Sequence, residues 1–177
     1  DLDLKSYRCA IVADCPTLDR IGAVQQGLDA DIRILNIDHH HGSDPFGTVN
    51  LVGNYSSTCE LVYHLATGLN YEIDAAVAAQ LYTGIIFDTG GFRFSLTQPS
   101  TFEAAADLAR KGVRLDYLAD HVFGNKSLDS VKQRGLAIAN LALPHEGQVA
   151  VLHLDLDAMR AGDPEEVTNY GLMVKGV

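Results

Sequence analysis

The stretch Ile32–His41, with the sequence I-R-I-L-N-I-D-H-H-H, decides the fold predicted for this chain. Its first six residues predict a buried strand, although Asn36 breaks the apolar run, and a polar cluster begins at Asp38. Cys9–Ala13, with the sequence C-A-I-V-A, predicts an earlier buried strand that ends at Asp14. Two such strands separated by a helical pattern are typical of a βαβ unit. The sequence therefore predicts an α/β fold with a parallel sheet flanked by helices.

Helical patterns surround these strands. The predicted helix between them begins near Pro16 and continues with apolar residues at helical spacing as far as Leu28. After a loop rich in Gly, Asp, Pro and Asn, Ser57 and Glu60 form an S-x-x-E capping box for the next helix. Further helices are predicted at 74–88, 100–111, 115–123 and 127–142, a strand at 148–154, and the start of another strand in the final M-V-K-G-V.

Composition is typical of an ordinary globular protein, with 47% hydrophobic and 20% charged residues. No apolar stretch approaches the roughly 18–20 residues that span a bilayer, and the first residues lack a secretory pattern. Three cysteines without C-x-x-C spacing favour reduced thiols over a disulfide framework or a zinc cluster, so a cytoplasmic location is expected. The net charge of −10 opposes a phosphate-bearing substrate unless divalent cations reverse the local field; simple solubility explains the charge equally well.

Candidate functional residues follow the predicted strands. Asp14 and the run Asp38-His39-His40 begin where apolar strands end, and ligands collect beyond the carboxyl ends of parallel strands. Histidine is the commonest side-chain donor for transition metals, and an adjacent carboxylate can orient its ring. Successive residues of an extended segment point to opposite sides, so His39 and His40 should have different roles. The alternative is that Asp14 only forms a turn and that the histidines belong to a polar loop.

Asp88 is the third candidate. It ends the predicted helix 74–88, where a carboxylate meets the negative end of the helix dipole at a cost of roughly 0.3–1 kcal/mol. A cation in front of it would explain this position; the alternative is a solvated Asp that caps the turn at 89–91. Carboxylates combined with one imidazole suit Mn²⁺ or Mg²⁺, which typically activate water in phosphoryl hydrolysis. The residues alone thus indicate a metal-dependent hydrolase of phosphate esters or anhydrides.

Three motifs in this order resemble those of the DHH phosphoesterase superfamily, in particular its NrnA/RecJ-like branch. They are Asp38-His39-His40, the strand-terminal segment V-A-D-C-P at 12–16, and T-G-I-I-F-D-T-G-G-F-R-F-S at 83–95. The segment Y-S-S-T-C-E at 55–60 fits the same branch. The resemblance covers nearly the whole chain.

The resemblance implies roles for individual residues. Asp14 would bridge two Mn²⁺ ions, and His39 and Asp88 would complete much of one ion's shell. His40 and Asp38 would be catalytic, with His40 facing the scissile phosphate. Arg93 is a candidate phosphate contact, and a purely structural arginine is the alternative.

The resemblance also sets expectations for the domains. Residues 1–125 would form a DHH-type catalytic domain, 126–145 a connecting helix, and 146–177 the start of a substrate-binding domain. The first motif of the family, a histidine and two aspartates, would lie before Asp1. We therefore expect this chain alone to be nearly inactive and to hold at most one metal ion weakly. Asp155 and Asp157 are interpreted as turn and cap residues.

The leading functional hypothesis is a phosphodiesterase that acts on short oligonucleotides or dinucleotides, with no membrane partner and a homodimer as one option. An inorganic pyrophosphatase or polyphosphatase of the same superfamily is the alternative within enzymes. A nucleotide-binding module without turnover is the alternative from another class.

Overall fold

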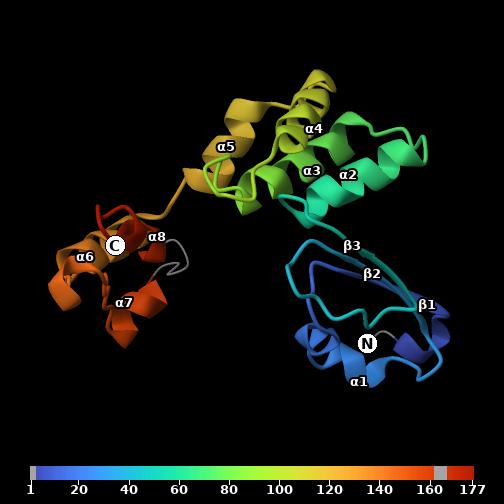
Figure 1. The fold of residues 1–177 in the computed structure, drawn as a ribbon, viewed down its shortest axis with the longest axis horizontal. Helices are drawn as coiled ribbons and strands as arrows, with labels where there is room; N and C mark the ends of the chain where they lie inside the picture. The colour runs from blue at the N-terminus through green and yellow to red at the C-terminus, as the bar shows by residue number, and fades with distance from the viewer. Residues whose placement is uncertain (1–2, 162–166) are drawn as a thin grey trace. The chain divides into compact units, whose positions relative to one another are not determined.

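A computed structural model describes residues 3–161 and 167–177 and divides the chain into two compact units, one ending at Val122 and one beginning at Phe123. The first unit contains a three-stranded sheet and a group of helices (Figure 1). The predicted α/β class with a parallel sheet is confirmed. No helix of the described residues is both long and apolar enough to cross a membrane.

The sheet has the order β1-β2-β3, formed by Cys9–Ala13, Arg33–Asp38 and Val49–Val52, and all neighbours are parallel. The first two strands were predicted, but the third lies in what the sequence indicated as a loop. Only four residues long, β3 carries Asn50, whose side chain bonds both the N–H and the C=O of Gly47. All three strands end at one edge of the sheet, which is where the candidate residues begin.

The connection between β1 and β2 differs from the single helix that was predicted. It consists of a 3₁₀ turn, η2 (Leu18–Ile21), and a one-turn helix, α1 (Val24–Gly27). Gly22 separates them with φ of 60°, a left-handed conformation that an α-helix cannot contain. Another 3₁₀ turn, η1 (Leu4–Ser6), precedes β1.

Four helices complete the first unit. They are α2 (Thr58–Gly68), α3 (Ala75–Asp88), α4 (Pro99–Arg110) and α5 (Leu115–Phe123), the last crossing the unit boundary by one residue. The predictions for all four are confirmed to within a residue or two. Helix α3 packs between α2 and α4, and the buried core there is formed by apolar side chains such as Leu81, Ile85 and Leu108 (Figure 1).

The capping box predicted for α2 is confirmed in one half only. Ser57 Oγ accepts a hydrogen bond from Glu60 N at 3.0 Å, as an N-cap should. The Glu60 carboxylate, however, accepts from Ser56 N at 2.9 Å instead of from Ser57 N. The glutamate is thus displaced towards the preceding residue and towards α4, whose Ser100 and Thr101 hydroxyls also bond it.

The second unit contains α6 (Leu128–Ala139), η3 (His145–Gly147), α7 (Leu156–Ala161) and α8 (Thr168–Leu172). The strand predicted at 148–154 is wrong, because only a single bridge forms, between Ala142 and Val151. The strand predicted at the end is also wrong, since the residues after α8 form a turn. Asp155 caps α7 by accepting from Ala158 N, as predicted for a cap residue.

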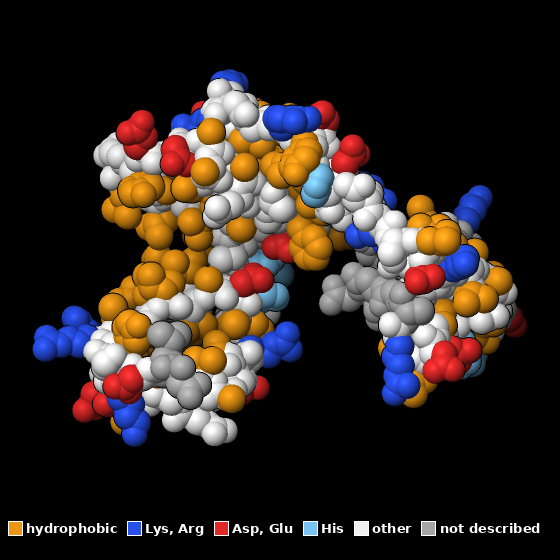
Figure 2. All heavy atoms as spheres, turned by 180° about the vertical axis from the view of Figure 1, so that it is seen from behind, with side chains coloured by type: hydrophobic (Ala, Val, Ile, Leu, Met, Phe, Trp, Pro, Cys, Tyr) orange, Lys and Arg blue, Asp and Glu red, His pale blue; other side chains and the backbone are white. Residues whose placement is uncertain are grey.

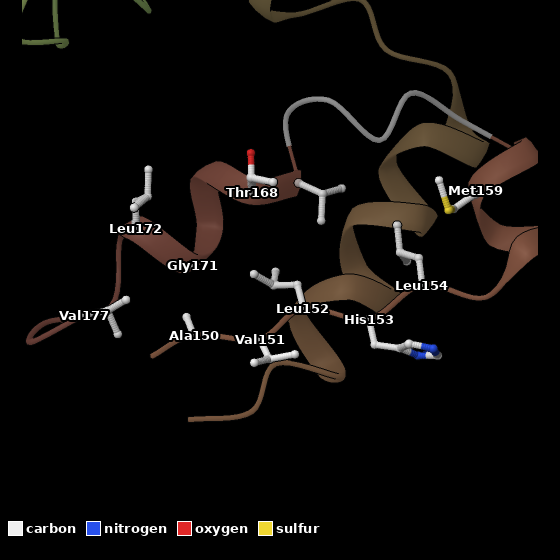
Figure 3. Close-up of a pocket in the computed structure, with 11 residues that line it drawn as sticks. Ala150, Val151, Leu152, His153, Leu154, Met159, Thr168, Gly171, Leu172 and Val177 are labelled. Atoms are coloured by element: carbon white, nitrogen blue, oxygen red, sulfur yellow. The ribbon is translucent and has the colours of Figure 1, made fainter. Parts of the chain in front are cut away.

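An apolar pocket of the second unit is lined by side chains that include Leu152, Met159 and Leu172 (Figure 3). None of the candidate site residues lies in it. The domain predicted at 146–177 includes residues 162–166, which lie outside those described.

Candidate metal centre

The backbone brings Asp14 and His39 together because each follows one of two adjacent parallel strands. The register pairs Ala13 with Ile37, and Asp14 N continues the ladder by donating to Ile37 O at 3.0 Å. Asp14 has φ of 61°, which is uncommon for a residue with a side chain and costs roughly 1–3 kcal/mol. The strained residue therefore stands where the strand turns away from the sheet.

Three side chains from separate elements converge at this edge. His39 Nε2 lies 3.4 Å from Asp14 Oδ1 and 3.7 Å from Asp88 Oδ2. His39 is 8% exposed, whereas the side chains of Asp88 and Asp14 are 28% and 53% exposed, so the group opens to solvent on the carboxylate side. Asp14, His39 and His40 also each offer a ligand atom within 4.8 Å of the others. Figure 2 shows acidic side chains in red next to histidine side chains in pale blue near the middle of the first unit.

The ring of His39 is oriented by a backbone carbonyl. Its Nδ1 lies 3.3 Å from Tyr55 O, and because a carbonyl only accepts, this contact favours the tautomer with the proton on Nδ1. Nε2 then presents its lone pair to the two carboxylates. A neutral imidazole held in this way is the form that binds metal ions.

Asp88 is the last residue of α3, and the turn after it is fixed by Gly91 N, which donates to Ile86 O at 2.8 Å, with Gly90 at φ of 57°. Burial raises the pKa of Asp88, as does the charge of Asp14, while His39 and His40 partly offset both. Within residues 3–122 the His39 ring is the only basic group within 4 Å of either carboxylate.

Asp14 and Asp88 both lie close to one imidazole nitrogen, and two carboxylates gathered in this way repel each other unless a cation lies between them. The donor set therefore fits a divalent metal ion. The nearby thiol of Cys59 is a poor ligand as it stands, because burial and the charges of Asp88 and Asp14 raise its pKa.

Asp38 and His40 form a separate pair beside this group. His40 Nδ1 lies 2.7 Å from Asp38 Oδ1, and the Ser43 hydroxyl donates to the other carboxylate oxygen. Burial acts to raise the pKa of Asp38, but the hydrogen bonds from Ser43 and His40 outweigh it and lower that pKa. Asp38 is fully buried and His40 is 44% exposed, so the carboxylate orients the ring and only the ring reaches the open side.

Arg93 lies in the turn that follows α3. Its Nε donates to Gly90 O at 2.7 Å, which satisfies a carbonyl of the turn after α3. This contact accounts for a structural role. The two terminal amino groups make no hydrogen bond within residues 3–122, so they remain candidates for a phosphate contact.

Sequence reasoning assigned no role to two residues that contact this group. Thr58 Oγ1 donates to Asp14 Oδ1 at 2.8 Å, and Tyr55 supplies the carbonyl that faces His39. The sequence feature that could have indicated these two residues is their position at the start of a capped helix, in the segment 55–60 that resembles the DHH superfamily.

No family model matches the chain. It is 31% identical over 152 residues to a Thermus thermophilus protein named bifunctional oligoribonuclease and PAP phosphatase NrnA, covering 85% of this chain and 46% of that protein. The crystal structure of an exopolyphosphatase-related protein from Bacteroides fragilis superposes with a TM-score of 0.87 at 26% identity, covering 96% of this chain and 53% of that one.

A Methanococcus jannaschii protein assigned as a family II inorganic pyrophosphatase shares the fold, with a TM-score of 0.56 at 16% identity over 75% of this chain and 47% of that one. The chain thus spans about half the length of each of these three proteins.

Proposed function

This chain belongs to the DHH phosphoesterase superfamily, and from that premise we propose that it carries part of a metal centre that hydrolyses phosphodiester bonds in short oligonucleotides or dinucleotides. The observation that carries the proposal is the convergence of Asp14, His39 and Asp88. The relative from Thermus thermophilus is named as an oligoribonuclease and phosphatase, which supports this class of substrate.

We assign the metal ligands to Asp14, His39 and Asp88, with Mn²⁺ as the proposed ion and Mg²⁺ as the alternative. A divalent ion held there would activate water and neutralise negative charge on the phosphate. The protein holds these ligands in place: the Tyr55 carbonyl orients the His39 ring, and the turn after α3 fixes the backbone at Asp88.

The proposed catalytic pair is His40 and Asp38. The buried, ionised Asp38 keeps the proton of His40 on Nδ1, so Nε2 is the nitrogen that can take up or release a proton next to the metal ligands. Arg93 is the proposed phosphate contact, through the amino groups that the Gly90 carbonyl does not use. Cytoplasmic location and a homodimer stay predictions of the sequence.

The test is an assay of the complete protein with Mn²⁺ on di- to pentanucleotides, with inorganic pyrophosphate in parallel. We expect cleavage of the diesters and its loss in Asp14→Asn and in His40→Ala. Turnover of pyrophosphate alone would favour the pyrophosphatase alternative. Binding of nucleotide without any turnover would favour the non-catalytic module and would contradict the proposal.

A further inference from the structure

Thr58, the first residue of α2, reaches the proposed metal centre with its hydroxyl group. Oγ1 donates to Asp14 Oδ1 at 2.8 Å, and that oxygen is the one that lies 3.4 Å from His39 Nε2. Within residues 3–122 no other hydrogen bond is made to the Asp14 carboxylate. The hydroxyl therefore contacts the same oxygen atom that faces the imidazole.

Asp14 needs such a contact to hold one orientation. Its side chain is half exposed and its backbone is strained, so packing alone leaves several staggered rotamers accessible. Restricting a side chain to one rotamer costs entropy, which a hydrogen bond of about 1 kcal/mol, or more to a charged acceptor, can offset.

The donor, in contrast, is held rigidly. Thr58 is buried, and the N-cap Ser57 fixes the turn that it begins. Glu60, fully buried, joins this turn to α4 through Ser100 and Thr101. The first turn of a helix also carries partial positive charge, which favours a carboxylate in front of it.

We propose that Thr58 is a positioning residue of the metal centre: its hydroxyl holds Asp14 in the orientation that presents Oδ1 beside His39. The same short segment supplies the Tyr55 carbonyl that orients His39, so one helix start positions two of the three proposed ligands. The inference rests on the proposed metal centre and adds the group that orders it before a metal ion binds.

The test compares Thr58→Val, which keeps the shape and loses the donor, with Thr58→Ser, which keeps the donor. Thr67→Val is the matched control, because Thr67 lies near the other end of α2 and, among the described residues, its hydroxyl bonds only Tyr63 O and His64 O. Two measurements are made on the 177-residue chain: Mn²⁺ affinity by calorimetry, and the position of the Asp14 carboxylate in crystals of the metal-free variants.

We expect Thr58→Val to weaken Mn²⁺ binding by about 10-fold or more, the effect typical of groups that orient metal ligands, and to release the Asp14 carboxylate from its place. Thr58→Ser and Thr67→Val should match the unsubstituted chain in both measurements. Equal affinity in Thr58→Val, or an unmoved carboxylate, would overturn the inference. If the unsubstituted chain binds no Mn²⁺, the metal centre itself fails, and the crystals still decide whether Thr58 orients Asp14.

Discussion

Replacing Glu60 with glutamine tests how the first unit holds α2 against α4. The buried carboxylate accepts hydrogen bonds from Ser56 N at 2.9 Å, Ser100 Oγ at 2.8 Å and Thr101 Oγ1 at 2.9 Å, and also from the Ser56 hydroxyl. Burial acts to raise the pKa of Glu60, but these hydrogen bonds outweigh it and lower that pKa below its ordinary 4.5. The group is therefore ionised and acts only as an acceptor.

The expected loss of stability follows from these four bonds. A hydrogen bond to a charged group contributes about 1.5–3 kcal/mol, and a neutral one about 1 kcal/mol. Glutamine can keep its oxygen towards Ser56 and Thr101, but its amide nitrogen then faces the Ser100 hydroxyl, which must rotate to accept. A loss of roughly 0.75 kcal/mol at each bond gives about 3 kcal/mol, a shift of roughly 100-fold in the unfolding equilibrium of the first unit.

Hydrogen–deuterium exchange of the amides in α2 and α4 measures this shift for the first unit by itself. Glu103→Gln is the matched control, because Glu103 is exposed on α4 and its replacement should change stability by less than about 0.5 kcal/mol. If Glu60→Gln exchanges no faster than Glu103→Gln, the carboxylate does not join the two helices and the reasoning fails.

The difference between the unsubstituted chain and Glu60→Gln should also depend on pH. Because the folded state lowers the pKa of Glu60, its contribution to stability is fully present above the unfolded value of about 4.5 and is lost as pH falls through the lower folded value. The two proteins should therefore approach each other in stability below about pH 4.5. A difference that stays constant over this range would contradict the assignment.

Three further substitutions, one of them a control, test packing and buried polarity by urea unfolding. Gly84→Ala would place Cβ 2.2 Å from Cys59 Sγ, where α2 and α3 approach, so we expect the free energy of unfolding to fall by about 1–3 kcal/mol. Gly135→Ala is the control: it has open space around it, so the free energy of unfolding should rise by up to about 1 kcal/mol. Equal effects of the two substitutions would contradict the packing of α2 against α3. Asn36→Leu should stabilise the chain by about 1 kcal/mol, because among the described residues neither polar atom of that buried side chain has a partner; a loss would show that the amide is satisfied.

The elements that the sequence predicted well are those with a local physical signal. Strand β1 is a continuous apolar run and β2 is an apolar run interrupted by Asn36, while α3 has Asp74 as its N-cap and Gly90 just past its end. Strand β3 escaped prediction because its four residues include a polar Asn50 between glycine-rich turns. A parallel strand is stabilised by the neighbouring strand of the sheet, and the sequence of the strand itself does not show which segment that neighbour is.

The same distinction applies to the candidate site. The meeting of Asp14 and His39 could be predicted, because adjacent parallel strands end at one edge. The role of Thr58 could not be predicted, because its hydrogen bond to Asp14 joins residues 44 apart in the sequence and depends on how α2 packs. The environment of Asp38 could not be predicted either, because it depends on the loop after β2, in which the Ser43 hydroxyl donates to the Asp38 carboxylate.

Anomalous scattering of Mn²⁺ in crystals of the chain tests directly whether Asp14, His39 and Asp88 hold one divalent cation. We expect one ion in direct contact with His39 Nε2 and with a carboxylate oxygen of each aspartate. Crystals grown in Mn²⁺ that show no ion at this group, or an ion bound only by other residues, would contradict it.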